Sequence, residues 1–209
     1  LVMTMSSWYG GNWERAEEEF KEGIALSESI GELRLAMLLK GNYATFLADR
    51  ATGSQDNQLY DHVRIPAVPV QSPEREQILD QALQMALDTF SSAEALGLLY
   101  SRVEARRTLG HVRFRRGELD EAERVCAEAM DLVADTESKV SRLWLGPTYI
   151  ETLLAVSKAA QEAGESEKAE AKRRDTEAVA GRYSEFVATC QSPRFTREAE
   201  RLMALVAGN

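Results

Sequence analysis

Cysteine is nearly absent from this sequence, and so are long apolar stretches. Cys126 and Cys190 are its only cysteines, and their distant spacing suits neither a disulfide framework nor a zinc site. No apolar run reaches the ~18 residues that a membrane-spanning helix requires. Residues 1–7 show neither the positive flank nor the cleavage pattern of a signal peptide. We therefore expect a protein of the reducing cytoplasm, with no membrane partner.

Glycine, proline and positive charge are also scarce. Only 13 glycines and 5 prolines occur in 209 residues, while Ala, Leu, Glu and Arg dominate, which favours helices over sheets. The 34 acidic side chains outnumber the 25 basic ones, and the formal net charge of -9 disfavours contact with a phosphate backbone. The sequence predicts an all-α protein whose main function is not nucleic-acid binding.

An internal repeat organises the chain. The segment LDQA at residues 79–82 recurs as LDEA at residues 119–122, an offset of 40 residues (119 − 79). A second offset of 66 residues carries Gly31 onto Gly97 and Ala16 onto Ala82. Since 66 exceeds 40 by 26, about that many residues are inserted within the second repeat.

The insertion occupies residues 52–73, between the two helices of the second repeat. Pro66, Pro69 and Pro73 fall in this stretch, which has no sustained helical period. Loops of this length are uncommon in compact domains and are usually either functional or disordered. Both interpretations of the inserted loop stay open.

The third repeat shows the pattern most clearly. Gly110 lies on its first helix, Gly117 turns the chain, and Ala122, Cys126 and Ala129 follow at spacings of four and three on its second helix. This alternation of small and large residues resembles the tetratricopeptide repeat (TPR) family. The 40-residue spacing is similar to the longer-helix variety of that family, found in signalling ATPases, transcriptional activators and adaptor proteins.

The resemblance covers most of the chain outside the insertion. Ala16 and Phe20 match the pattern in a first repeat, whereas Arg173 and Thr176 replace the expected apolar or small residues in a fourth. The resemblance implies a right-handed superhelical array of about four antiparallel helix hairpins, spanning residues 1–209 as a single array and closed by a capping helix at 194–207. The expected helices cover residues 1–9, 12–30, 32–50, 74–91, 94–116, 118–134, 140–163, 165–190 and 194–207. We also expect the chain to be a fragment of a longer protein.

Catalytic motifs are missing. The only histidines are His62, in the inserted loop, and His111, on a helix, and the sequence has no Gly-rich phosphate loop, nucleophile elbow or zinc-protease helix. Cys126 falls at a packing position and reads as a structural thiol. We expect no enzyme, no cofactor and no metal, and keep an unrecognised site at His62 as the less favoured alternative.

The TPR resemblance implies a partner protein or peptide in a concave groove lined by the first helix of each hairpin. Arg107, His111 and Arg115 stand on one helical face, and with Lys158 they would form a positive patch that suits an acidic peptide. The alternative is that these arginines pair with Glu104 or Glu118 on the surface. The expected lining residues are Met5, Trp8, Tyr9, Asn42, Thr45, Asp49, Arg107, His111, Phe114, Arg115, Leu154, Lys158 and Gln161.

Within this lining, different residues are expected to bind in different ways. Trp8 and Tyr9 are the expected aromatic anchors, and Asn42 could clamp a peptide backbone. Trp8 could equally pack against a repeat that is missing upstream of this fragment. The leading hypothesis is a non-catalytic protein-interaction module, and the alternative is the effector-sensing segment of a larger signalling protein.

Overall fold

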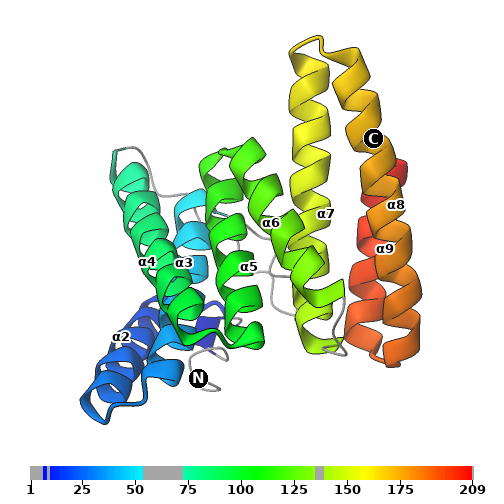
Figure 1. Cartoon of the computed structure of the whole chain (residues 1–209). Helices are drawn as coiled ribbons and strands as arrows, with labels where there is room; N and C mark the ends of the chain where they lie inside the picture. Colours follow the sequence, from blue (N-terminus) through cyan, green and yellow to red (C-terminus); the bar gives the residue numbers. More distant parts are fainter. Residues whose placement is uncertain (1–6, 9, 54–72, 135–138, 209) are drawn as a thin grey trace. The chain divides into compact units, whose positions relative to one another are not determined.

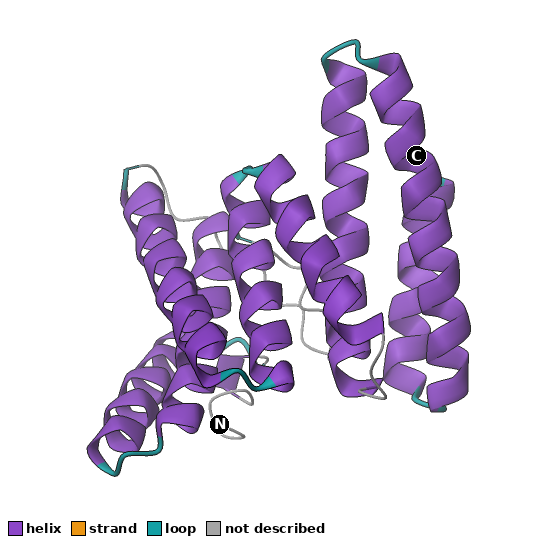
Figure 2. Cartoon of the chain, in the orientation of Figure 1, coloured by secondary structure: helices purple, strands orange, loops and turns teal. Residues whose placement is uncertain are grey.

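The computed structural model describes residues 7–8, 10–53, 73–134 and 139–208, and all regular structure in these ranges is α-helical (Figure 2). The helices of known extent are α2 (Trp13–Ser29), α3 (Leu33–Thr52), α4 (Glu74–Leu96), α5 (Leu99–Arg116), α6 (Leu119–Ala134), α7 (Lys139–Glu162), α8 (Ser166–Cys190) and α9 (Pro193–Ala207). The predicted all-α class is therefore confirmed for the described part of the chain. Within it, no helix combines the length and apolar character needed to span a membrane.

The chain divides into two compact units, residues 1–116 and 117–209, and each holds four of these helices (Figure 1). In the first unit α2 packs on α3, α3 on α4 and α4 on α5, and α3 also contacts α5. In the second unit α6 packs on α7, α7 on α8 and α8 on α9, and α7 also contacts α9. Neighbouring helices thus pack in adjacent pairs, as expected for a helical repeat, whereas a single superhelical array over both units stays a prediction.

Helix boundaries follow the turn glycines closely. Gly31 and Gly97, equivalent in the 66-residue offset, both adopt positive φ, at 76° and 66°. The Gly97 N–H bonds to the carbonyl of Ala93, which ends α4 with a left-handed residue. The predicted helix break between residues 91 and 94 was therefore wrong, because α4 continues to Leu96. Residues 54–72, the bulk of the predicted insertion, lie outside the described part of the chain.

Small residues let the helices of the first unit approach closely around an aromatic cluster. Ala16 and Ala82, equivalent in the repeat, are both completely buried. The ring of Phe20 stacks on that of Tyr43 at 5.3 Å between centroids and packs against Phe46 at 5.5 Å. The burial of these positions agrees with the sequence register.

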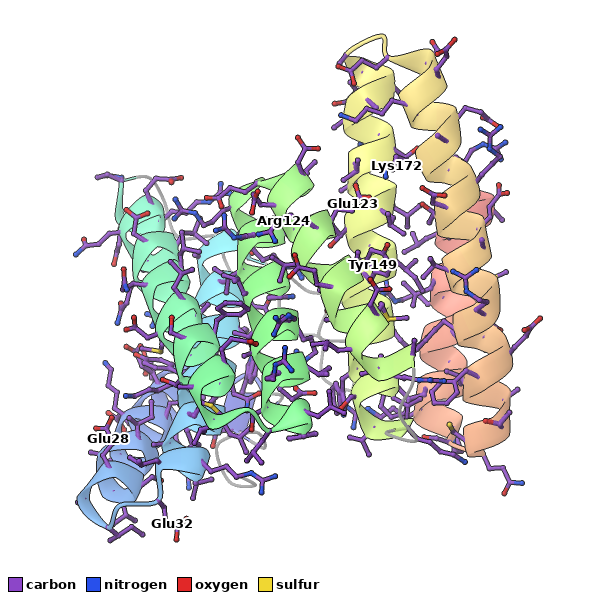
Figure 3. All side chains as sticks on the ribbon, viewed as in Figure 1. Glu28, Glu32, Glu123, Arg124, Tyr149 and Lys172 are labelled. Atoms are coloured by element: carbon purple, nitrogen blue, oxygen red, sulfur yellow. The ribbon has the colours of Figure 1, made fainter. Side chains whose placement is uncertain are left out.

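An ion pair joins α6 and α8 in the second unit. Lys172 Nζ on α8 donates to Glu123 Oε1 on α6 at 2.5 Å (Figure 3). Burial, reinforced by the negative charge of Glu123, raises the pKa of Tyr149 on α7 to about 12, so this phenol stays neutral at physiological pH.

A proline in the middle of α7 is compensated by a tyrosine of α8. Pro147 has no N–H to donate to the carbonyl of Leu143, four residues earlier. Tyr183 Oη donates to that carbonyl instead, at 3.0 Å. The aromatic ring reaches this position by lying flat on Gly146, where a Cβ atom would come within 2.3 Å of it. The register of α8 against α7 is therefore set by the local contact among Gly146, Pro147 and Tyr183.

A helix, α9, occupies the residues for which a capping helix was predicted. Phe195, Ala199, Leu202 and Val206, at spacings of four, three and four, form its buried face. These side chains join a core with residues of α7 and α8. The helix covers part of the α7–α8 hairpin, as a capping element of a repeat protein does.

Replacing Tyr183 with Phe should lower the free energy of unfolding by about 1–3 kcal/mol, because the Leu143 carbonyl is left buried without its donor. Urea denaturation of the wild type and Tyr183→Phe measures the loss. In a Pro147→Ala background the helix regains its own N–H donor, so the same change should cost much less. Equal losses in the two backgrounds would show that the hydroxyl does not compensate the proline.

Candidate functional site

One of the two predicted aromatic anchors, Trp8, is not available to a partner. Trp8 is 3% exposed, and its ring packs against Phe20 and Phe46 at 6.1 and 5.7 Å between centroids. The prediction that Trp8 binds a partner was wrong, since the tryptophan belongs to the core of the first unit. Met5 and Tyr9 lie outside the described residues.

The polar residues predicted on α3 are turned mostly inward. Thr45 is 6% exposed, and its hydroxyl donates to the carbonyl of Gly41 at 3.2 Å, so it cannot serve as a groove residue. Asn42 donates its amide to the carbonyl of Leu38 at 2.9 Å. Asn42 and Arg107 line a cavity of about 10 Å³ between α3, α4 and α5, which has room for one water molecule and no side chain.

Asp49 is a structural acid rather than a groove residue. Its carboxylate is 1% exposed, and Oδ1 lies 2.8 Å from His111 Nε2 and 3.2 Å from Arg115 Nε. The separation of Asp49 and Arg115 is 66 residues, the offset found in the sequence, so equivalent positions of α3 and α5 meet in space. The prediction that Asp49 contacts a partner was therefore wrong, because its carboxylate is buried between the two helices.

The positive patch on α5 forms, but its charge is already balanced. Arg107 Nε donates to Glu104 Oε2 at 2.9 Å, which confirms the alternative of pairing with Glu104 for this arginine, although the pair is largely buried and not on the surface. Arg115 pairs with Asp49 and lies over the ring of Phe114, 5.2 Å from its centroid. An acidic ligand would have to compete with these internal carboxylates.

Burial is the largest influence on His111 and lowers the pKa of its imidazole, although the neighbouring Asp49 carboxylate acts in the opposite direction. The imidazole is therefore neutral at neutral pH, where its Nε2 faces the carboxylate oxygen. A neutral, largely buried histidine held by a buried acid serves packing better than ligand attraction.

Other arginines of α5 are also paired with carboxylates. Arg102 Nε donates to Glu94 Oε1 at 3.1 Å, and Arg106 donates to the same oxygen. Arg116 Nη1 lies 2.6 Å from Asp80 Oδ1. These pairs reduce the positive field along α5 and further disfavour nucleic-acid binding.

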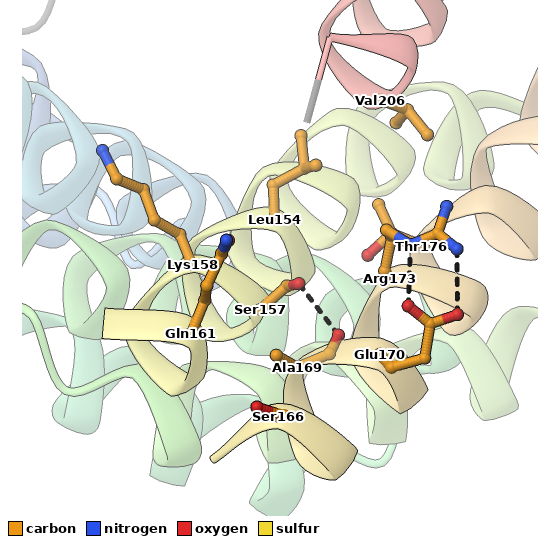
Figure 4. Close-up of a pocket in the computed structure, with 10 residues that line it drawn as sticks. All are labelled: Leu154, Ser157, Lys158, Gln161, Ser166, Ala169, Glu170, Arg173, Thr176 and Val206. Atoms are coloured by element: carbon orange, nitrogen blue, oxygen red, sulfur yellow. Dashed lines mark hydrogen bonds and ion pairs between the residues drawn. The ribbon is translucent and has the colours of Figure 1, made fainter. Parts of the chain in front are cut away.

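The second unit holds a larger pocket, between α7 and α8. Its volume is about 300 Å³, and it lies along one face of each helix (Figure 4). Three of the predicted groove residues line it together on α7: Leu154, Lys158 and Gln161. The remaining lining residues are Ser157 of α7, Ser166, Ala169, Glu170, Arg173 and Thr176 of α8, and Val206 of α9.

Polar contacts around this pocket leave one cation well exposed. Arg173 holds both oxygens of Glu170, at 2.9 and 3.1 Å, and the pKa of Glu170 is lowered chiefly by this hydrogen bonding. Lys158 Nζ lies 3.9 Å from Glu162 Oε1, and its side chain is 70% exposed. Lys158 is therefore the cation of the pocket that a ligand can reach most readily.

The α8 side of the pocket was missed in the sequence because only the first helix of each hairpin was taken as lining. A signal was present, since Arg173 and Thr176 depart from the repeat pattern and both line the pocket. The long, charged side chain of Arg173 and the polar side chain of Thr176 stand where a repeat would place apolar or small residues.

Residues of interest for metal binding and catalysis can be placed only in part. Among the residues that the structure describes, no cluster of three or more His, Cys, Asp or Glu could hold a metal ion. Cys126 is fully buried in the second unit, as expected for a packing position. His62, named as an alternative catalytic base, lies outside the described ranges. The pocket offers hydroxyl, amide, ammonium and apolar groups, together with the paired Glu170 carboxylate and Arg173 guanidinium, and such groups can bind and orient a ligand.

Neutralising Asp49 should destabilise the first unit by about 3–5 kcal/mol, because Arg115 then keeps its buried position without its acid. Urea denaturation of Asp49→Asn measures this loss. Asp80→Asn is the matched control, since Asp80 pairs with Arg116 but its side chain is 70% exposed. The control should lose less than about 1 kcal/mol; an equal loss in the two variants would contradict the structural role of Asp49.

The lowered pKa of His111 also predicts a pH dependence. Because the unfolded chain binds this proton at its ordinary pKa and the folded chain binds it only at lower pH, stability should fall as the pH drops below about 6.5. Urea midpoints at pH 7.5 and 5.5 should show a smaller drop for His111→Gln than for the wild type. The same drop in both proteins would mean that His111 does not titrate in this way.

The chain matches no protein-family model, and neither a curated protein nor a solved structure matches it. The candidate site therefore rests on the geometry of the α7–α8 pocket. The likeness to TPR proteins remains one of sequence pattern and paired helices.

Proposed function

We propose that this chain is a TPR-like protein-interaction module without catalytic activity, and that the α7–α8 pocket is where it holds a partner protein or peptide. The observation that carries the proposal is the meeting of Leu154, Lys158 and Gln161 in one pocket. These residues were expected from the repeat register to line a partner groove, and α8 adds a second wall opposite them.

The size of the pocket supports a peptide ligand. A volume of about 300 Å³ lies at the lower end of the range for ligand pockets and accommodates one or two side chains. An enzyme would in addition need an activated nucleophile, whereas Ser157 of the lining donates to the carbonyl of Ala169 and Glu170 is held by Arg173. Binding is the function that the lining residues support best.

In the proposed site the positive charge comes from Lys158 on α7 and not from the arginines of α5. Arg107 and Arg115 are paired with Glu104 and Asp49, so their charges stabilise the first unit. Lys158 has only a long contact with Glu162. An acidic group on the partner would therefore be attracted to Lys158.

A photo-crosslinker in the pocket tests this function. Gln161→p-benzoylphenylalanine, introduced into the protein in its source cells, should give a discrete covalent adduct with a partner protein on illumination. Lys158→Glu in the same protein should abolish the adduct, because it reverses the exposed charge of the site. Mass spectrometry of the adducts provides the measurement.

Lys139→Glu is the matched control, since Lys139 is also exposed on α7 but lies in its first turn. This variant should keep the adduct. No adduct at position 161, or equal loss with both charge reversals, would reject the pocket as the partner site.

A further inference from the structure

The groove between α7 and α8 already holds one helix, which is α9. The buried face of α9 consists of Phe195, Ala199, Leu202 and Val206 and packs into a core with both helices of the hairpin. Arg201 on α9 also donates to Glu151 Oε1 of α7, at 2.5 Å. The chain itself therefore shows what this groove accepts: an amphipathic helix with a narrow apolar face.

The pocket is the continuation of the same groove. Val206, in the last turn of α9, is one of its lining residues, and Figure 4 places it beside Leu154 and Thr176. Figure 1 shows that α9 ends short of the turn between α7 and α8. Since α9 has 15 residues and α7 has 24, roughly 13 Å of α7 extends beyond the length of α9, at about 1.5 Å per residue.

From this continuity we propose that the α7–α8 pocket receives an amphipathic helix of a partner protein, with a leucine-sized side chain in the pocket and a carboxylate one turn away at Lys158. The inference rests on the proposed function and names the partner's chemistry. An apolar side chain would contact Leu154 near Val206, where α9 leaves the groove; Thr176 also lines the pocket but is fully buried.

The spacing of the lining residues matches one turn of a helix. Leu154 and Lys158 are four residues apart on α7, so they stand one above the other on the same face. A partner helix lying alongside can present an apolar and an acidic residue at the same spacing of four. Helices packed at the usual 8–10 Å between axes bring such side chains into contact.

The charges of the pocket favour a carboxylate on the partner. Arg173 is occupied by Glu170 and Glu177, which lie on either side of it on α8. Lys158 has its nearest carboxylate at 3.9 Å, on the exposed Glu162. A partner carboxylate can replace this weak contact without breaking a buried pair.

Three synthetic peptides test the inference. Each is an alanine-based helical 15-mer: the first carries one leucine and, four residues later, one glutamate; the second has glutamine in place of the glutamate; the third has alanine in place of the leucine. Amide shifts of the ¹⁵N-labelled 209-residue chain are followed during titration. Binding of the first peptide should perturb the amide shifts of residues 154–161 and 166–176. The glutamine peptide should bind about two- to fivefold more weakly, as expected for the loss of an exposed ion pair. The alanine peptide should cause no perturbation of these residues.

Charge reversal at Lys158 provides the matched variant. Lys158→Glu should remove the preference for the glutamate peptide, and Lys139→Glu should retain it. Equal binding of all three peptides, or perturbations outside the pocket, would overturn the inference. Self-association of the free chain that Lys158→Glu abolishes would also overturn it, in favour of a second copy as the occupant.

The peptide and crosslinking results separate the two proposals. If the adduct at position 161 forms but none of the peptides perturbs the pocket, the partner is not an amphipathic helix of this kind and the interaction function stands. If neither the adduct nor the perturbation occurs, both proposals fail.

Discussion

The candidate site depends on the contact between Tyr183 and the backbone of α7 around Pro147. A proline in the middle of a helix leaves a carbonyl without its donor, and in an apolar core that carbonyl needs another. Tyr183 provides it through the hydroxyl bond to Leu143, and the bare backbone of Gly146 gives the ring its place. The two helices are thereby held in one register at the end of the hairpin where α9 packs. The pocket walls farther along the hairpin are held in addition by the bond from Ser157 of α7 to the carbonyl of Ala169 of α8.

The first unit uses charge for the same purpose. Asp49 joins Arg115 in the neighbouring repeat and lies beside His111 as well, and its burial makes any other pairing of α3 and α5 costly. A buried ion pair adds little to the free energy of unfolding when compared with an apolar pair. It does disfavour an arrangement in which α3 is shifted along α5. Because cations of α5 are paired with carboxylates inside the first unit, this helix retains little charge for attracting an acidic partner.

Much of the fold could be predicted from the sequence because repeat positions carry the same packing constraint each time. Ala16 and Ala82 are both fully buried, and the 66-residue offset reappears as the hydrogen bond between Asp49 and Arg115. The site could be predicted less well. Counting along helices identifies a face, yet it does not show that Asp49 lies opposite Arg115 or that Trp8 fills the core, since both depend on contacts between residues far apart in sequence. The break at Gly97 was misplaced for a different reason: helix propensity stays high on both sides of it, and only the left-handed backbone at the glycine marks the end.

The position of the pocket follows from where the repeat pattern fails. A face packed against another helix needs apolar or small side chains, and α9 meets such a face on α7 and α8 as far as Val206. Beyond that point α8 carries Arg173, and α7 carries Lys158 and Gln161, which a packed helix would have to dehydrate. The same side chains are well suited to a surface that alternates between water and a partner, because they can be hydrated in one state and paired in the other. A departure from a repeat consensus at a packing position is therefore itself an indication of function, provided that the neighbouring positions still follow the pattern.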